Sequence, residues 1–150
     1  MNQPVYLLSG SRTALGAYLG ALSTVPAPQL AATAISSALE KAELRPDQIS
    51  HAWVGQVLQA GVGQAPARQA VLAAGLAEHT SAVTVNKVCG SGLEAIICAV
   101  RSIALGETSL AVAGGMENMS LAPHLIPQAN WVGSPPVSVS GTGVGVLITL

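Results

Sequence analysis

The sequence predicts an α/β fold in which a mostly parallel β-sheet carries helices on both of its faces. Short apolar runs of strand length alternate four times with longer segments of helical periodicity. The links between them are short and rich in glycine and proline. Such alternation favours parallel strands joined by helical crossovers. With 150 residues, the chain is long enough for one domain with a sizeable core.

The first strand and helix are expected before residue 43. Residues 4–8 are apolar and end at a Ser-Gly pair, which fits a buried parallel strand. Arg12, in the loop that follows, is interpreted as a structural residue that holds carbonyls or an ion pair, and an anion contact is the alternative. Residues 27–42 have apolar side chains at helical spacing, with Pro28 in the first turn and Pro46 beyond the end.

Residues 52–57 predict a second strand because they are β-branched and aromatic in character, and Trp53 is expected to pack against a neighbouring element. The loop after this strand contains Gly61 and Gly63. It lacks the third glycine of a dinucleotide fingerprint, and no Lys-Ser or Lys-Thr follows. We therefore expect no nucleotide site there. Pro66 suits the first turn of the next helix.

The third strand, expected at residues 83–88, runs directly into Cys89. After a Gly-Ser-Gly turn, residues 93–105 are apolar nearly all round and predict a buried core helix. This helix is shorter than the roughly 17 residues that a membrane-spanning helix requires. Residues 110–113 predict a fourth strand, which ends at two glycines.

A strand, a glycine turn and a helix would place Cys89 near a helix N-terminus. Unpaired backbone N–H groups and the helix dipole favour a thiolate there, and small neighbouring residues let the chain turn sharply and expose a nucleophile. Cys89 is the candidate catalytic residue; a small buried core cysteine is the alternative. Cys98, in an apolar helical context, is interpreted as such a core residue. On one helix the two sulfurs would lie about 13 Å apart, so we expect free thiols.

Residues 86–93, Asn-Lys-Val-Cys-Gly-Ser-Gly-Leu, closely resemble the acyl-cysteine segment of the thiolases. Four further segments resemble thiolase segments, in thiolase order and at thiolase spacing: residues 12–16, 55–61, 64–70 and 113–120. The resemblance covers roughly residues 3–127. Within the family it is closest to the acetyl-CoA acetyltransferases.

The resemblance implies the fold of the first half of a thiolase, with the element order βαβαβαβ. Residues 1–127 are assigned to this N-terminal domain. Residues 128–150 form an atypical tail that does not resemble the coenzyme A-binding loop domain expected at this point of a thiolase. No residue of this chain is assigned to cofactor binding.

The resemblance also implies a chemistry. In thiolases a cysteine thiolate takes the acetyl group of acetyl-CoA, and the enolate of a second acetyl-CoA attacks the acetyl-cysteine to give acetoacetyl-CoA. On this pattern Cys89 is the acyl-thioester nucleophile, and its backbone N–H contributes to an oxyanion hole. The histidine, the second cysteine and the water-holding asparagine of the family are not located in this sequence.

Five other polar residues receive structural interpretations. His51, His79 and His124 are expected to be surface or structural residues and not catalytic bases. Glu117 and Asn118 follow the last predicted strand, at the end of a sheet where doubly wound folds place their sites. They are expected to hold the loops around the site by hydrogen bonds.

Composition limits the partners. A net charge of -1 with scattered basic residues excludes a nucleic-acid binder, and no Cys/His spacing of the zinc type occurs, so no metal is expected. No cofactor is expected either, since coenzyme A thioesters are the substrate.

The N-terminus lacks secretory and organellar targeting patterns, which predicts a cytoplasmic protein outside the membrane.

The resemblance implies a homodimer or tetramer with residues 84–88 and the Gln64 loop at an interface. Hydrophobic residues make up 50% of the chain and charged residues 9%, which agrees with partner-covered surface. Two hypotheses remain open. In the first, the chain is an acetyl-CoA acetyltransferase with Cys89 as acyl carrier. In the second, it is a truncated, non-catalytic thiolase fragment that acts, if at all, through subunit association.

Overall fold

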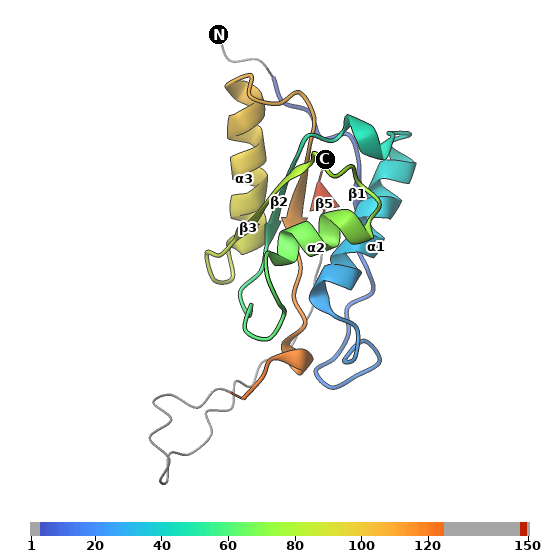
Figure 1. Cartoon of the computed structure of the whole chain (residues 1–150), viewed down its shortest axis with the longest axis vertical. Helices are drawn as coiled ribbons and strands as arrows, with labels where there is room; N and C mark the ends of the chain where they lie inside the picture. Colours follow the sequence, from blue (N-terminus) through green and yellow to red (C-terminus); the bar gives the residue numbers. More distant parts are fainter. Residues whose placement is uncertain (1–3, 125–147, 150) are drawn as a thin grey trace.

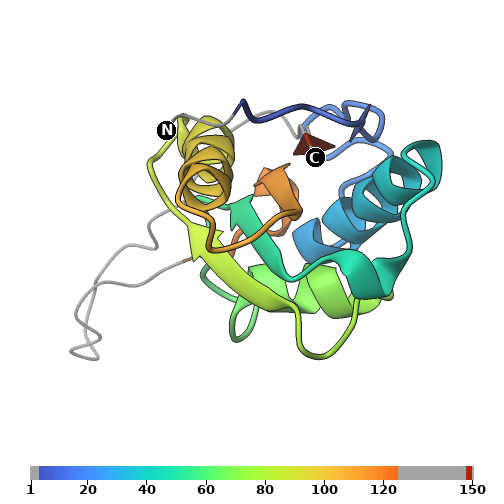
Figure 2. The same cartoon turned by 90° about the horizontal axis from the view of Figure 1, so that it is seen from above.

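The structure, a computed structural model, describes residues 4–124 and 148–149. In chain order its elements are β1 (Gly10–Ser11), α1 (Ala27–Lys41), β2 (His51–Gly55), α2 (Pro66–Ala73), β3 (Ser81–Val85), α3 (Ser91–Ala104), β4 (Ala111–Gly115) and β5 (Ile148–Thr149), with 3-10 turns at Pro46–Gln48 and Met119–Leu121. The sheet has the strand order β1-β5-β4-β2-β3. Helices α1 and α2 cover one face and α3 covers the other (Figures 1 and 2). The predicted α/β class is confirmed.

The three central strands are parallel and in register. His51 of β2 lies opposite Ser81 of β3 and Ala111 of β4, and Gly55 lies opposite Val85 and Gly115. Only the short strand β5 pairs antiparallel, with β4 on one side and β1 on the other. The carboxyl ends of β2, β3 and β4 therefore lie side by side at one edge of the sheet, where open α/β sheets place their sites.

Helix α1 follows the predicted pattern closely. It begins after Pro26, has Pro28 in its first turn and ends at Lys41. Its buried side is built largely from alanine, with Leu30, Ile35 and Leu39 as the large side chains. Small side chains let α1 lie close to α2 and to the sheet, and these elements enclose the main core.

Strand boundaries differ from the predicted ones by one to three residues. The predicted strand 52–57 is β2, 110–113 is β4 and 83–88 is β3. The third difference is the largest: β3 ends at Val85, so a turn separates it from Cys89. The backbone angle of Val88, φ 49°, lies in the left-handed region and cannot continue a strand.

The prediction of a buried strand at residues 4–8 is wrong. The structure assigns no strand there, and Tyr6 is 71% exposed. An apolar run forms a strand only where a neighbouring strand accepts its hydrogen bonds. In the described sheet β2 pairs with β3 and β4, and β5 takes the position next to β4. The N-terminal segment reaches the sheet only at β1, on its edge.

Helix α3 is buried on one side only, so the prediction of an all-round buried helix is also wrong. Its buried residues are small: Ser91, Ala95, Ala99 and Ser102. The large side chains Leu93 and Leu105 are 64% and 75% exposed. The sheet covers the inner side, where Trp53 packs as predicted, and no other described element covers the outer side.

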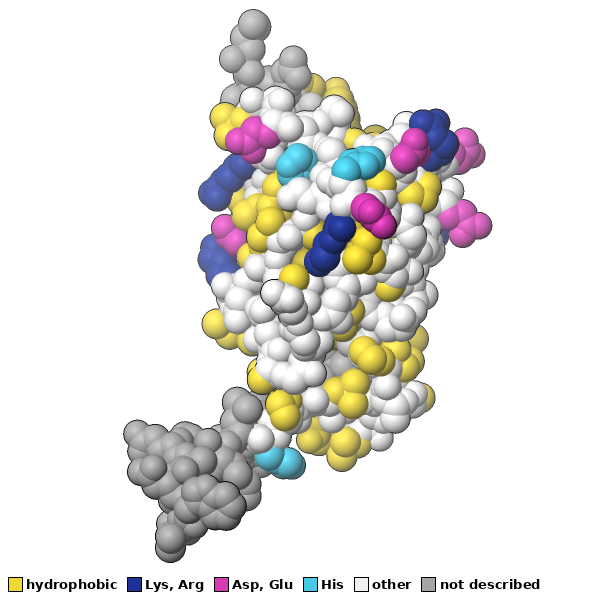
Figure 3. Space-filling model, viewed as in Figure 1, with side chains coloured by type: hydrophobic (Ala, Val, Ile, Leu, Met, Phe, Trp, Pro, Cys, Tyr) yellow, Lys and Arg dark blue, Asp and Glu magenta, His cyan; other side chains and the backbone are white. Residues whose placement is uncertain are grey.

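Charge is distributed unevenly over the face drawn in Figure 3. Charged side chains gather on the upper half, and the lower half carries mostly hydrophobic and uncharged side chains. The central strands run toward this lower end in Figure 1. The site edge of the sheet is therefore the less charged end of this face.

Candidate active site

Cys89 lies in the turn that joins β3 to α3, as the sequence predicts. It is exposed and directly precedes Gly90, the N-cap residue of α3. The first backbone N–H groups of a helix have no acceptor inside the helix. Here Gly90 N and Ser91 N donate to Lys87 O and Val88 O within the turn, and the positive end of the helix dipole suits an anionic sulfur at Cys89.

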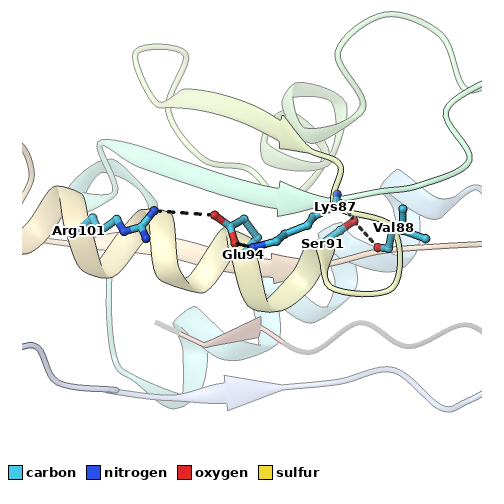
Figure 4. Close-up of polar contacts among 5 residues, drawn as sticks. All are labelled: Lys87, Val88, Ser91, Glu94 and Arg101. Atoms are coloured by element: carbon cyan, nitrogen blue, oxygen red, sulfur yellow. Dashed lines mark hydrogen bonds and ion pairs between the residues drawn. The ribbon is translucent and has the colours of Figure 1, made fainter.

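The residue before Cys89 has an unusual backbone conformation. Val88 is β-branched, and its φ of 49° places it in the left-handed region that such residues rarely adopt. Strain of this kind persists only where surrounding contacts hold it. Asn86 Oδ1 accepts a hydrogen bond from Val88 N at 3.1 Å. Ser91 Oγ accepts from Lys87 N at 2.9 Å and donates to Val88 O at 2.6 Å (Figure 4).

Glycines at the ends of β2 and β4 let the start of α3 lie directly on the sheet. A Cβ placed on Gly55, at the end of β2, would stand 2.5 Å from the carbonyl carbon of Ser91. One on Gly115, at the end of β4, would stand 3.2 Å from Gly92 Cα. Glycine is needed for this approach because any side chain at Gly55 would collide with helix backbone. The turn that carries Cys89 is thus seated against the carboxyl ends of two strands.

A cavity of about 560 Å³ opens at this edge of the sheet. Cys89 and the first turn of α3 form one wall, and the segments that follow β2 and β4 form the others. Its lining is mostly apolar: Gly55, Gln56, Val57, Leu58, Val88, Cys89, Ser91, Gly92, Leu93, Ile96, Gly115, Met116, Glu117 and Met119. A pocket of this size and character suits a small organic ligand next to the thiol.

Glu117 and Asn118 hold the surrounding loops, as predicted. Glu117 Oε2 accepts hydrogen bonds from Val57 N at 2.8 Å and Leu58 N at 3.2 Å. Asn118 Nδ2 donates to three carbonyls of the segment before α1, those of Leu22, Ser23 and Val25, at 3.0, 3.2 and 2.7 Å. Both residues join segments about sixty or more positions apart in the sequence.

The Lys87 side chain extends along α3 toward Glu94 (Figure 4). Its ammonium forms an ion pair with Glu94, and Arg101 Nη1 lies 3.8 Å from the other carboxylate oxygen (Figure 4). The hydrogen bond from Lys87, with the charges of Lys87 and Arg101, lowers the pKa of Glu94. The positive charge nearest to Cys89 in sequence is therefore matched by a carboxylate.

The histidines and Arg12 are where the sequence analysis expects them. His51 stacks on Trp53 with ring centroids 5.5 Å apart, and His79 and His124 are exposed. None of the three lines the cavity beside Cys89. Arg12 Nη1 donates to the carbonyl of Thr13 at 2.8 Å, so it holds a carbonyl.

Three residues of the site are missed by the sequence analysis. Ser91 and Val88 shape the turn, yet a serine in a glycine-rich string gives no sign of its hydrogen bonds. Gln56 is 1% exposed and lines both the cavity beside Cys89 and a second cavity of about 330 Å³. The signal for Gln56 is its place directly after an apolar strand, at the site edge of the sheet.

Metal and membrane features are not found within residues 4–124 and 148–149. No three His, Cys, Asp or Glu side chains among them gather closely enough to hold a metal ion. None of the helices in this part of the chain has the length and apolar character needed to cross a bilayer.

Comparison with known families agrees with this geometry. The family model described as "Thiolase, N-terminal domain" matches residues 5–138. The chain belongs to the thiolase family. The match extends past residue 127, the end of the thiolase-like part in the sequence analysis. The tail at 128–150 lies outside the described residues except for β5.

Individual thiolases show the same relationship. An acetyl-CoA acetyltransferase of Cupriavidus necator is 51% identical over 123 residues, which cover 82% of this chain and 31% of that protein. A cytosolic acetyl-CoA acetyltransferase of Rattus norvegicus is 48% identical over 124 residues, 83% of this chain and 31% of that protein. The chain thus spans about a third of the length of these relatives.

A solved thiolase shares the fold. The crystal structure of the thiolase Acat5 from Ascaris suum in complex with coenzyme A superposes with a TM-score of 0.85 at 34% identity. The superposition covers 88% of this chain and 35% of that one. The α/β arrangement described above is therefore that of a thiolase.

Proposed function

We propose that this chain carries the acyl-accepting cysteine of an acetyl-CoA acetyltransferase. The Cys89 thiolate attacks the thioester carbonyl of acetyl-CoA, the bond from that carbonyl to the sulfur of coenzyme A breaks, and an acetyl-cysteine forms. Coenzyme A leaves as its thiolate, and the proton that the Cys89 thiol gave up balances its conversion to the thiol. The enolate of a second acetyl-CoA then attacks the acetyl-cysteine. A carbon–carbon bond forms, the cysteine thiolate is released, and the product is acetoacetyl-CoA.

One observation carries this proposal. Cys89 is an exposed thiol on the wall of a mostly apolar cavity, and it stands directly before the N-terminus of α3. Backbone donors at a helix start stabilise the thiolate and, in the acyl-transfer step, the tetrahedral oxyanion. The Cys89 N–H is the first donor that we assign to this oxyanion. The apolar walls reduce competition from water for the acetyl-cysteine.

The substrate and the partners follow from the same proposal. The names of the relatives support acetyl-CoA as acyl donor, and the coenzyme A complex of the Ascaris suum thiolase supports a coenzyme A thioester. We infer no resident cofactor, since the thioester itself supplies the activated acyl group. Residues 1–127 are proposed as the thiolase N-terminal domain and residues 128–150 as an atypical tail that is assigned to no domain.

A homo-oligomer in the cytoplasm is part of the proposal. Strand β3 is at one edge of the described sheet, and an edge strand offers backbone groups to a second chain. This supports residues 84–85 of the predicted interface, which comprises residues 84–88 and the Gln64 loop. The word cytosolic in the name of the rat relative supports the cytoplasmic location.

The test is the intact mass of the folded chain after treatment with acetyl-CoA and an acid quench. One acetyl group is expected, and it should be lost in Cys89→Ala but kept in Cys98→Ala, which removes the other thiol. A folded chain that gains no acetyl group contradicts acyl transfer by this chain. That result favours the alternative, a thiolase piece that acts through association.

A further inference from the structure

The turn before α3 must be held in a conformation that its sequence disfavours. Val88 has a left-handed backbone and a β-branched side chain that is itself exposed, so packing of the valine does not hold it. Whatever fixes Val88 also fixes the direction in which Cys89, the next residue, presents its thiol.

Two backbone hydrogen bonds, from Gly90 N to Lys87 O and from Ser91 N to Val88 O, close this turn, and three side-chain groups hold it further. Asn86 and the Lys87–Glu94 ion pair lie at the surface, where water competes for their hydrogen bonds and salt screens their charges. Ser91 is different, because it is 4% exposed. Its hydroxyl both accepts from Lys87 N and donates to Val88 O.

Ser91 is also well anchored. It is the first residue of α3, and the carbonyl carbon of Ser91 lies so close to Gly55 that no side chain fits between them. The hydroxyl therefore has a defined place relative to β2. Through its two hydrogen bonds the hydroxyl fixes the Asn86–Lys87 peptide group, at Lys87 N, and the Val88–Cys89 peptide group, at Val88 O (Figure 4).

We propose that Ser91 is a positioning residue for Cys89: its hydroxyl holds Val88 in the left-handed conformation and thereby fixes the thiol at the start of α3. The importance of this role for catalysis rests on the proposed function of Cys89 as nucleophile. The positioning itself can be measured without acyl transfer, by the chemical reactivity of the thiol.

The experiment uses the full chain with Cys98→Ala, in which Cys89 is the sole cysteine. The rate of alkylation by iodoacetamide at neutral pH is followed by intact mass. In Ser91→Ala the turn relaxes and the thiol leaves the helix start, so the rate should fall by about threefold or more. Ser102→Ala is the matched control, since Ser102 is equally buried on α3 but bonds to Glu107 at the far end. It should leave the rate unchanged.

Two rescues distinguish positioning from general loss of structure. Thr and Val have nearly the same shape, so Ser91→Thr should react at least about threefold faster than Ser91→Val if the hydroxyl is what matters. Val88→Gly added to Ser91→Ala should restore part of the lost rate, because glycine adopts the left-handed conformation without steric cost. If Ser91→Ala lowers the alkylation rate only because it disrupts packing, Val88→Gly should not restore that rate.

The possible results test the role of Ser91 and the proposed function separately. A folded Ser91→Ala that reacts like the parent, or that slows no more than Ser102→Ala, overturns the role of Ser91. If Ser91→Ala does not fold, the Thr and Val pair decides, and equal rates in that pair overturn it. Acetylation by acetyl-CoA is measured in the same samples: a parent chain that is alkylated but not acetylated contradicts the proposed function alone.

Discussion

The two faces of the sheet are built in different ways. On one face α1 and α2 enclose a continuous core whose buried members include Leu30, Ile35, Val54, Val71 and Val112. On the other face Ala99 of α3 and two alanines of β4 form a small cluster packed with Trp53 and two isoleucines of α3, and the outer side of α3 is exposed. The first face supplies most of the buried apolar area. On the second face, close backbone contacts and hydrogen bonds fix one end of α3, next to Cys89.

The difference separates stability from function. Burial of apolar area is the main stabilising contribution in folding, so the α1–α2 face should dominate the free energy of unfolding. The function of a reactive group depends instead on the accurate position of the few atoms around it. The glycine contacts, the strained Val88 and the hydrogen bonds of Ser91 all lie on the α3 side. Substitutions on the two faces should therefore be told apart by which measurement they change.

The largest expected effect is in the core of the α1–α2 face. Ile35 is fully buried there, and Ile35→Ala should lower the free energy of unfolding by about 3 kcal/mol because it leaves a cavity. Leu93→Ala, on the exposed side of α3, should change it by less than about 0.5 kcal/mol. Urea denaturation of the two variants measures this. Similar losses in both would contradict the contrast between the faces.

The second-largest effect is expected where the start of α3 packs against the sheet. Gly55→Ala places a methyl group 2.5 Å from the backbone of Ser91, and the expected destabilisation is about 1 to 3 kcal/mol. The shift of α3 should also slow alkylation of Cys89. Gly92→Ala is the control, since its Cβ would meet Gly115 at an ordinary 3.6 Å. If Gly92→Ala slows alkylation as much as Gly55→Ala, close approach at Gly55 is not what places the thiol.

The smallest effect concerns the ion pair on the surface of α3. The folded-state pKa of Glu94 is lowered, first by the hydrogen bond from Lys87. The ion pair therefore contributes its full stabilisation above pH 4.5, the ordinary pKa of this carboxyl group. That contribution is lost as the pH falls through the lowered pKa. Glu94→Gln should lower the urea midpoint slightly at neutral pH and not at strongly acidic pH.

An exposed carboxylate of α1 serves as the comparison for this prediction. Glu40 has no ion pair among the described residues, so Glu40→Gln should leave the midpoint unchanged at both pH values. If Glu94→Gln also lowers the urea midpoint at strongly acidic pH, the substitution acts through helix packing or helix propensity and not through the charge of the pair.

Much of the fold could be predicted because it depends on local patterns. Apolar spacing and flanking prolines predicted α1 to within one residue at its end, and Pro66 marked the first turn of α2. The glycine turn before an apolar helix placed Cys89 at the start of α3. Polar residues after β4 were expected to hold loops, and Glu117 and Asn118 do so.

The wrong predictions have one physical origin. Residues 4–8 and the outer side of α3 are apolar, and apolar character shows only that a segment gains from burial. It does not show what covers the segment. In the described structure the sheet has no place for residues 4–8 beside β2, and the sheet covers only one side of α3.

The sequence by itself determined the alternation of strands and helices, the membership of the thiolase family and the position of Cys89 between a strand and a helix, because each depends on residues close together along the chain. Only the tertiary structure decided how the thiol is presented. The contact of Gly55 with α3 arises where segments distant in sequence meet. The left-handed Val88 and the hydrogen bonds of Ser91 involve residues only three or four positions apart, yet they depend on backbone geometry that the residue types alone do not fix. Their energies depend on distances of a few tenths of an ångström, which residue patterns do not contain.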